Sequence, residues 1–434
     1  MHNKRMGKIK NFKELATSDL RKAALAIAEA GLAAVDTDAV IRSAVRIEEE
    51  TLHLAGEAIP LSSIKRLFVV GAGKCAMRAV ATLEEILGNR IAGGAVIDVQ
   101  QWFLKRVKYF KGDHPYPTPK NTEGAAKIIE ILNGAEEGDL VLAIVSGGGS
   151  TLLAVPPEGW TVEKEVAVVK PLFRAGADIV ELNTIRKHLS RARGGYLASY
   201  AHPARVVALV MSDVPGDKLE FISSGPFVKD TTTVEDARAI LEKYGVEKAI
   251  GFPVEGLVET PKDDEHFKNV RNVLIVSNQT ALRAMEAAAK AQGFSPRTVT
   301  NAFNGEARTV AATVISDLAA APAGSALLYG GESTVTIRGK GTGGRNQELA
   351  LAALPSVKPG ELILSFASDG HDNTDAAGAL CDIMAKNKAK ELKIDSTQYL
   401  EENDSYSFFE RVGAQVVTGD TGSNISDLVI ALRE

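Results

Sequence analysis

The sequence predicts an α/β protein made of two α/β domains, the first with a Rossmann-like, mostly parallel sheet. Short apolar runs alternate with segments of helical periodicity along the chain. Continuous apolar runs of this kind are typical of strands that are buried on both faces. The chain has 434 residues, which exceeds the size at which one hydrophobic core usually keeps growing. Two separate cores are therefore expected.

The N-terminal half contains the clearest strands. The predicted strands are 67–70, 94–99, 140–145 and 206–211, and the predicted helices are 19–35, 122–133 and 163–177. Parallel strands need long crossover connections, usually helices, so this alternation favours a parallel sheet.

A polar segment interrupted by proline separates the two halves. Gly251-Phe252-Pro253 and Thr260-Pro261 break the periodic pattern, as glycine and proline do in loops. We therefore expect a linker at about 250–271, an N-terminal domain over 1–255 and a smaller C-terminal domain over 270–434. For the second half we predict strands 273–276, 326–329, 362–366 and 428–432 and helices 279–291, 305–320, 346–353 and 376–390.

Composition excludes several classes of function. A net charge of -5 and a pI near 5.9 leave no basic footprint for nucleic acid. Cys75 and Cys381 cannot form a disulfide framework, and no zinc-ligand spacing is present. No apolar signal core follows the basic residues 1–10, and no uninterrupted apolar run approaches the roughly 20 residues of a membrane span. These features predict a cytoplasmic protein without a membrane partner; a homo-oligomer remains open.

Glycine-rich turns after the predicted strands point to an anionic ligand. In open α/β sheets, ligands bind where strands end and helices begin, and glycine presents backbone amides there without bulk. One such turn is weak evidence, because tight turns need glycine for conformational reasons. The turns lie at 71–74, 146–150, 212–217, 330–333, 341–348 and 368–372. Their recurrence favours phosphate chemistry.

The segment Ser146-Gly147-Gly148-Gly149-Ser150, here called the cradle, is the strongest candidate phosphate site. Its consecutive amides can wrap an anion, and its two hydroxyls add neutral donors; the alternative is a flexible turn. Arg345 follows Gly343-Gly344 at the start of a predicted helix and can hold a phosphate or carboxylate with its fork. Glu332 and Asn346 belong to the same pair of turns and complete this candidate group.

Lys74 ends the turn Gly71-Ala72-Gly73. The turn departs from a Walker A loop, because Phe68 and Cys75 stand where glycine and Ser or Thr are needed. It also fits a dinucleotide turn, with Asp98 at the end of the next strand as a ribose ligand. Spacing alone leaves a solvated turn lysine and a catalytic lysine as equal alternatives.

Asp213 and Asp369 each follow an apolar strand. Either carboxylate could bind Mg²⁺ or accept the proton of an attacking hydroxyl. The structural alternative for each is a helix N-cap or an Asx-turn. Asp217 and Asp372 are second choices.

Arg186, Lys187 and Arg191 form a basic cluster in an otherwise acidic chain. On a helix, Lys187 and Arg191 would face the same way, because they are four residues apart. A solvated basic face is the alternative to an anion site. His114 lies in a proline-rich turn, and the sequence gives it no role.

The segments 182–190, 194–195, 212–214, 224–226, 341–348 and 418–424 together resemble the glycerate 2-kinase family, whose C-terminal part is called the MOFRL domain. The resemblance covers nearly the whole chain after about residue 12. It implies ATP-dependent phosphorylation of D-glycerate to 2-phosphoglycerate with Mg²⁺ or another divalent cation, in a cleft between two domains. It also implies that Lys74 belongs to the active site, where it could neutralise charge on the transferred phosphoryl group.

Two other functions are compatible with part of these motifs. An NAD(P)H-dependent hydroxypyruvate reductase would use the 71–76 turn for its cofactor, and some members of the family have carried that name. The other glycine-rich turns that could bind an anion would then have no function. A non-catalytic nucleotide sensor would need the cradle but not the metal carboxylates.

Overall fold

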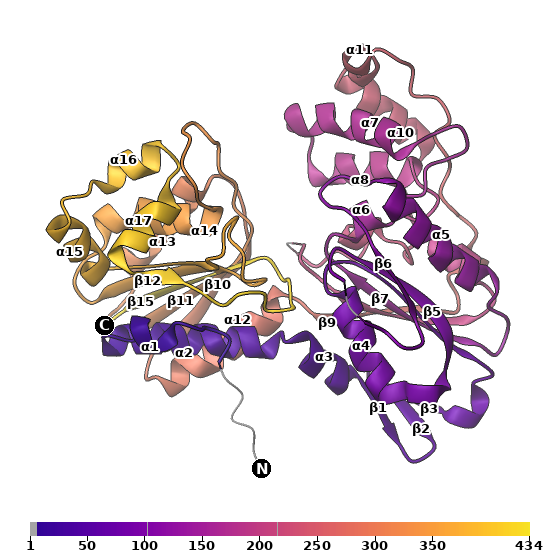
Figure 1. Cartoon of the computed structure of the whole chain (residues 1–434), viewed down its shortest axis with the longest axis horizontal. Helices are drawn as coiled ribbons and strands as arrows, with labels where there is room; N and C mark the ends of the chain where they lie inside the picture. The colour runs from indigo at the N-terminus through magenta and orange to yellow at the C-terminus, as the bar shows by residue number, and fades with distance from the viewer. Residues whose placement is uncertain (1–6, 102, 215) are drawn as a thin grey trace. The chain divides into compact units, whose positions relative to one another are not determined.

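The computed structural model describes residues 7–101, 103–214 and 216–434. They form two compact units, one of Thr37–Ile275 and one in which residues up to Asp36 join Val276–Glu434. We call them the Rossmann-like unit and the mixed-sheet unit. Each contains a six-stranded sheet with helices (Figure 1), so the predicted α/β class is confirmed. Within the described ranges no helix has the length and apolar character needed to cross a membrane.

The sheet of the Rossmann-like unit has the strand order β6-β5-β4-β7-β8-β9. Its strands are β4 (Leu67–Ala72), β5 (Ile91–Asp98), β6 (Lys108–Lys111), β7 (Leu140–Ser146), β8 (Arg205–Met211) and β9 (Val270–Val276). The pairs from β6 to β8 are all parallel. Along β7, Val141, Ala143 and Val145 enter the core on one face, while Leu142 and Ile144 enter the core on the other. This two-sided burial explains the continuous apolar runs.

Helices cover both faces of this sheet. The core on one face includes α5 (Pro119–Asn133), α6 (Gly149–Leu152) and α9 (Tyr196–Ala201). On the other face lie α3 (Thr37–Ala44), α4 (Ala76–Leu87) and a three-stranded sheet of β1 (Val45–Glu48), β2 (Thr51–Leu54) and β3 (Glu57–Pro60). A further apolar cluster joins α7 (Val162–Arg174), α8 (Ile179–His188), α10 (Val234–Lys243) and α11 (Val246–Ile250) beyond one end of the strands (Figure 1).

The sheet of the mixed-sheet unit has the order β10-β11-β15-β12-β13-β14. Only β10 and β11 pair in parallel among the described neighbours; the other pairs are antiparallel. The strands are β10 (Ser295–Phe303), β11 (Ser325–Gly331), β12 (Glu361–Ala367), β13 (Gly378–Asp382), β14 (Gln415–Val416) and β15 (Asp427–Arg433). The helices after β10 are α13 (Ala307–Ala320), α14 (Arg345–Ala353), α15 (Ile383–Glu391), α16 (Ser396–Glu401) and α17 (Ser405–Val412).

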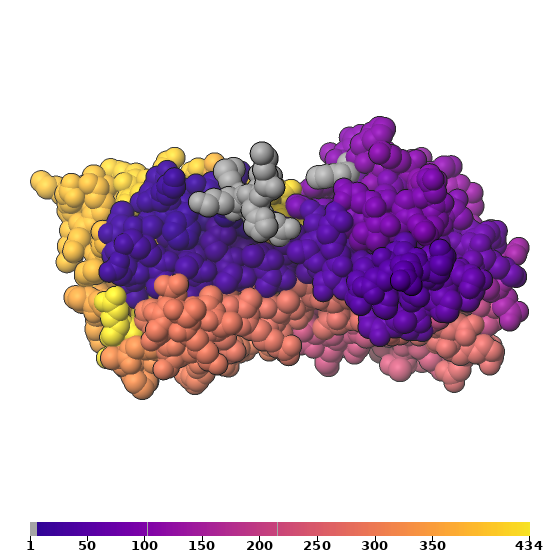
Figure 2. Space-filling view, turned by 90° about the horizontal axis from the view of Figure 1, so that it is seen from below, coloured from indigo at the N-terminus to yellow at the C-terminus, as the bar shows by residue number. Residues whose placement is uncertain are grey.

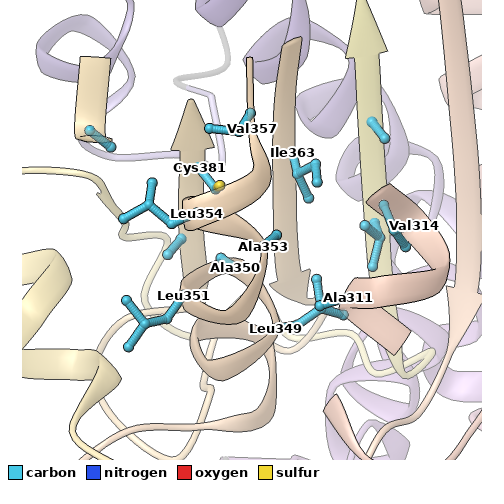
Figure 3. Close-up of a cluster of buried hydrophobic side chains, with 14 of the residues drawn as sticks. Ala311, Val314, Leu349, Ala350, Leu351, Ala353, Leu354, Val357, Ile363 and Cys381 are labelled. Atoms are coloured by element: carbon cyan, nitrogen blue, oxygen red, sulfur yellow. The ribbon is translucent and has the colours of Figure 1, made fainter. Parts of the chain in front are cut away.

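The core on one face of this sheet is centred on α14. Figure 3 shows Leu349 and Ala350 of α14 near Val314 of α13 and Ile363 of β12. All four are essentially inaccessible to water. The core therefore fixes α14, and with it the position of Arg345 at the first turn of that helix.

The opposite face is covered by α12 (Asn278–Ala291) and by the N-terminal helix α2 (Asp19–Ala34), which follows the short α1 (Phe12–Leu15). Figure 2 shows the indigo N-terminal segment alongside the salmon segment that contains α12. Arg21 of α2 also forms a buried pair with Asp382, with Nε 2.6 Å from Oδ2. The predicted N-terminal domain of 1–255 is thus wrong for its first helix, because α2 packs against α12, β12 and β15 of the mixed-sheet unit.

The predicted linker also differs from the structure. Residues in 250–271 pack on the Rossmann-like unit: Val254 joins its helical cluster, and the Val258 carbonyl oxygen lies 2.8 Å from Nδ1 of His188. The strand predicted at 273–276 is β9, the edge strand of the Rossmann-like sheet, rather than the first strand of the second domain.

One predicted helix is half wrong. Within 376–390, Gly378–Asp382 forms β13, antiparallel to β12, and the helix α15 begins only at Ile383. All five residues of β13 are buried, so pairing with β12 overrides the local helical pattern. The sequence also did not predict β1 to β3, β6 or β10, which are short, partly exposed or polar strands. The remaining predicted elements are present within a few residues.

Candidate functional site

The first candidate site lies at the carboxyl ends of β4 and β7, which are neighbours in the centre of the Rossmann-like sheet. The chain continues outward from β4 to β5 and β6 on one side, and from β7 to β8 on the other. Such a reversal of strand order opens a crevice in which ligands bind in open α/β sheets. Lys74 follows β4 and the cradle follows β7, so the fold brings these two predicted segments together.

Hydrogen bonds join the two loops. Lys74 N donates to the Gly147 carbonyl at 2.9 Å, and Cys75 N donates to Ser146 Oγ at 3.2 Å. Gly73 has φ 132°, and a Cβ on it would stand 2.1 Å from Ser146 Oγ. Ser146 is buried, and its hydroxyl oxygen accepts from the Cys75 amide, so this side chain links the two loops; its predicted role as a donor to an anion stays a prediction.

The cradle has the backbone form of an anion-binding nest. Gly148 is left-handed, with φ 81° and ψ -10°, and the helical α6 begins at Gly149. Among the described residues, the amides of Gly148, Gly149 and Ser150 have no hydrogen-bond acceptor. Successive amides in this conformation form a concave site for an anion.

Lys74 and His114 border this nest. A Cβ on Gly148 would stand 3.3 Å from Lys74 Cε and 3.5 Å from His114 Cδ2. Partial burial, together with the charges of Lys74 and Arg186, lowers the pKa of His114 to about 4. Burial also lowers the pKa of Arg186 to about 10, helped by the charge of Arg193. At neutral pH the His114 imidazole beside the nest is therefore neutral.

Asp213 follows β8 and reaches the same loop. A Cβ on Gly147 would stand 1.7 Å from Asp213 Oδ2, so this carboxylate lies directly against the cradle backbone. The predicted role of Asp213, as a ligand of Mg²⁺ or as the acceptor of the hydroxyl proton, stays a prediction.

The predicted basic cluster is divided. Helix α8 ends at His188, so Lys187 and Arg191 do not share a helix face as predicted. Lys187 is buried and pairs with Asp230 at 3.0 Å, whereas Arg191 is exposed. Burial alone would raise the pKa of Asp230, but Lys187 and Thr232 lower it overall. Lys187 thus stabilises the helical cluster, whereas the guanidinium of Arg186 lies over the Phe173 ring, 5.4 Å from its centroid, and its charge lowers the pKa of His114.

A second group of predicted residues lies in the mixed-sheet unit, where β11 and β12 end and β15 begins. Arg345 Nε lies 2.6 Å from Asp427 Oδ2, Nη2 lies 3.1 Å from Oδ1, and Nη1 lies 2.5 Å from Glu332 Oε1. These bonds take three of the five guanidinium N–H donors. Burial raises the pKa of Asp427 to about 7, although Arg345 opposes the rise.

The start of α14 is capped from within the protein. Asp372 accepts from Asn346 N at 3.0 Å and from Gln347 N at 2.8 Å. Asn346 is buried, and its side chain bonds to Ser365 and Asp372. The prediction that this helix start binds an anionic ligand is therefore wrong for the amides of Asn346 and Gln347, because both already donate to the Asp372 carboxylate.

The two predicted metal ligands belong to different units: Asp213 to the Rossmann-like unit and Asp369 to the mixed-sheet unit. Asp369 Oδ1 accepts from His371 N at 3.0 Å, which is the Asx-turn that the sequence offered as an alternative. Over the described ranges, no group of three or more His, Cys, Asp or Glu side chains could hold a metal. A divalent cation would need oxygens from a bound phosphate.

Sequence reasoning missed several side chains at the nest. His114 stood in a turn without a role, while Asn183 and Ser224 were only parts of a family motif. Ser150 Oγ lies 2.9 Å from Ser224 Oγ, which in turn lies 2.6 Å from Asn183 Oδ1. The sequence feature that could have indicated these residues is the pair of polar residues at 223–224 before Gly225-Pro226. It can be connected with the nest only once the strand order is known.

Comparisons with known proteins agree with these observations. Residues 23–259 match the family model described as "Domain of unknown function (DUF4147)", and residues 325–427 match the MOFRL family. The chain is 36% identical over 428 residues to the D-glycerate 2-kinase of Thermotoga maritima, covering 95% of this chain and 98% of that protein. A relative from Agrobacterium vitis, 38% identical and covering 84% of this chain and 86% of its own length, carries the provisional name hydroxypyruvate reductase.

A solved structure is also similar. The crystal structure of the glycerate kinase from Thermotoga maritima matches with a TM-score of 0.83 at 35% identity, covering 96% of this chain and 99% of that chain.

Proposed function

Because this chain belongs to the glycerate kinase family that carries the MOFRL domain, we propose that it is an ATP-dependent D-glycerate 2-kinase. It would transfer the γ-phosphoryl group of ATP to the 2-hydroxyl of D-glycerate. The observation that carries the proposal is the nest at Gly148 to Ser150, bordered by Lys74 and His114.

Phosphoryl transfer needs positioned positive charge more than covalent help from the protein. The cradle amides would bind oxygens of the transferred group, and Lys74 would neutralise the charge that develops on it. Fixed donors of this kind need no reorganisation during the reaction. Arg186 would hold the remaining phosphates or the substrate carboxylate; Arg191, also predicted there, is exposed and contributes less.

Asp213 is the carboxylate closest to the cradle backbone, and we assign it the proton of the attacking hydroxyl or one ligand of Mg²⁺. Mg²⁺ is commonly bound by one or two carboxylates together with substrate phosphates, so Asp213 next to a phosphate nest fits the ion. When bound, the ion would screen the negative charge of the triphosphate. Asp369, Glu332 and Arg345 remain predicted contributors from the mixed-sheet unit.

The reductase alternative is weakened by Asp98. In a dinucleotide site this carboxylate would face the ribose. Here Asp98 is buried, with Oδ2 accepting from Met77 N at 3.0 Å and Oδ1 from Gln100 N at 3.1 Å. It therefore fixes the start of α4. Loss of NADH absorbance with hydroxypyruvate would nevertheless revive this function.

One coupled assay tests the proposal. With D-glycerate and ATP, enolase without phosphoglycerate mutase should carry the product forward to phosphoenolpyruvate, because enolase acts on the 2-phosphate. A product that requires the mutase would be 3-phosphoglycerate. Binding of ATP without any ADP release in the presence of D-glycerate would instead indicate the nucleotide sensor.

A further inference from the structure

A short chain of side-chain hydrogen bonds leads from the nest into the protein. Ser150 Oγ lies 2.9 Å from Ser224 Oγ. Ser224 Oγ donates to Asn183 Oδ1 at 2.6 Å, and Asn183 Nδ2 donates to the Ile179 carbonyl at 2.8 Å. Ser224 and Asn183 are buried, whereas Ser150 is half-buried.

The direction of each bond follows from the donors available. The Asn183 amide is oriented by its bond to the Ile179 carbonyl, so its oxygen must accept from Ser224. A serine hydroxyl has one proton, and Ser224 already uses that proton in its hydrogen bond to Asn183. Ser150 must then donate its own proton to Ser224. The Ser150 oxygen is left as an acceptor toward the nest, beside its own unpartnered amide.

The chain of bonds is held rigidly. Ser223, Ser224 and Gly225 have φ values of 53°, 58° and 59°, a left-handed conformation that disfavours non-glycine residues. The Ser224 carbonyl accepts from Gly194 N and the Gly225 carbonyl from Gly195 N, both at 2.8 Å. Backbone strain of this kind persists where surrounding bonds over-determine it, and it is enriched at functional sites.

The Ser150 oxygen, as an acceptor, repels an anionic oxygen that approaches it and favours a hydroxyl, whereas the neighbouring amides of the nest remain donors for phosphate oxygens. The chain ends in an amide, which is not a base, so Ser150 has no route by which to take a proton away. It suits a hydroxyl that keeps its proton, rather than the hydroxyl that attacks phosphorus. D-Glycerate has one hydroxyl that attacks phosphorus and one that keeps its proton.

We propose that Ser150, oriented by Ser224 and Asn183, is a specificity residue that binds the non-reacting hydroxyl of the acceptor substrate. The inference rests on the proposed function and deepens it. If the 2-hydroxyl is phosphorylated, Ser150 binds the 3-hydroxyl. D-Lactate is the matched probe, because it lacks only that hydroxyl and keeps the carboxylate and the 2-hydroxyl.

The test is the ratio of kcat/KM for D-glycerate to that for D-lactate. A site built to bond a hydroxyl rejects the analogue without it strongly, so the wild-type ratio should exceed about 100. Ser150→Ala should reduce the ratio to less than about tenfold, mainly by weakening use of D-glycerate. Ser150→Thr keeps the hydroxyl and should keep most of the ratio.

Ser223→Ala is the matched control. Its hydroxyl donates to the Ser146 carbonyl at 2.8 Å and so supports the same loop without touching Ser150. It should alter use of both substrates by the same factor. Equal losses for both substrates in Ser150→Ala, or a wild-type ratio below about ten, would overturn the proposal.

Binding measurements separate this inference from the proposed function. Titration calorimetry with D-glycerate and D-lactate, in the presence of a non-hydrolysable ATP analogue, needs no phosphoryl transfer. Preference for D-glycerate that disappears in Ser150→Ala supports the subsite even if no kinase activity is found. Equal binding of the two acids by the wild type refutes the subsite even if the kinase activity is confirmed.

Discussion

Replacing Arg345 by methionine should lower the free energy of unfolding by about 2–3 kcal/mol at pH 8. Methionine keeps an apolar stem but removes the bonds to Asp427 and Glu332. Asp427 is 1% exposed, and removing one partner of a buried ion pair costs about 3–5 kcal/mol. Arg345 is 34% exposed and Glu332 46% exposed, so the second pair contributes little and the total falls below that range.

The loss of stability in the Arg345→Met variant should be larger at pH 8 than at pH 5. Burial raises the pKa of Asp427 to about 7 from an ordinary value of 3.8. A group with a raised folded pKa stabilises the fold fully below its unfolded pKa and loses that contribution as pH rises through the folded pKa. Without Arg345 the folded pKa of Asp427 rises further, so the variant loses more stability than the wild type between about pH 5 and pH 8.

Urea unfolding followed by circular dichroism measures the free energy of unfolding of the variant and the wild type at pH 5 and at pH 8. In an Asp427→Asn background the same substitution should cost less at pH 8, because the buried charge is absent. Equal deficits at the two pH values, or a deficit below about 0.5 kcal/mol at pH 8, would show that Asp427 is not held by Arg345.

Three further outcomes are expected. Lys74→Ala should lower kcat by at least about tenfold with little change in KM, because the lysine acts on charge that develops in the transition state; normal kcat in a folded variant would contradict this role. Gly149→Ala should impair the cradle, because a Cβ there would stand 2.1 Å from Ser223 Oγ. Gly93→Ala is the control, because Gly93 likewise has no positive φ and a Cβ there would meet nothing within 4 Å; equal activities of the two variants would argue against the clash. Small-angle scattering should show compaction when an ATP analogue and D-glycerate are added together, as expected if both units act on the same substrates; unchanged scattering would disfavour a shared site.

The sequence alone determined the class of fold and where its turns lie. Strands such as 140–145 are detectable because burial on both faces demands a continuous apolar run, and helices such as 122–133 because one face is apolar. Glycines mark the cradle because Gly147 and Gly149 lie against Asp213 and Ser223 without room for a side chain. The apolar patterns are local requirements that the sequence records directly, and the glycines are visible in the sequence although the partners that require them are distant.

Only the tertiary structure decided which of these segments meet and what each polar group does there. Strand order places Lys74 beside the cradle, and the apolar face of the mixed sheet recruits α2 from the far end of the chain. Lys187 and Arg345 read alike as cations in the sequence, yet one pairs with Asp230 and the other with Asp427. The direction of the bond between Ser150 and Ser224 depends on a third residue, Asn183. Partners distant in sequence set charge, burial and hydrogen-bond direction, and no local pattern encodes them.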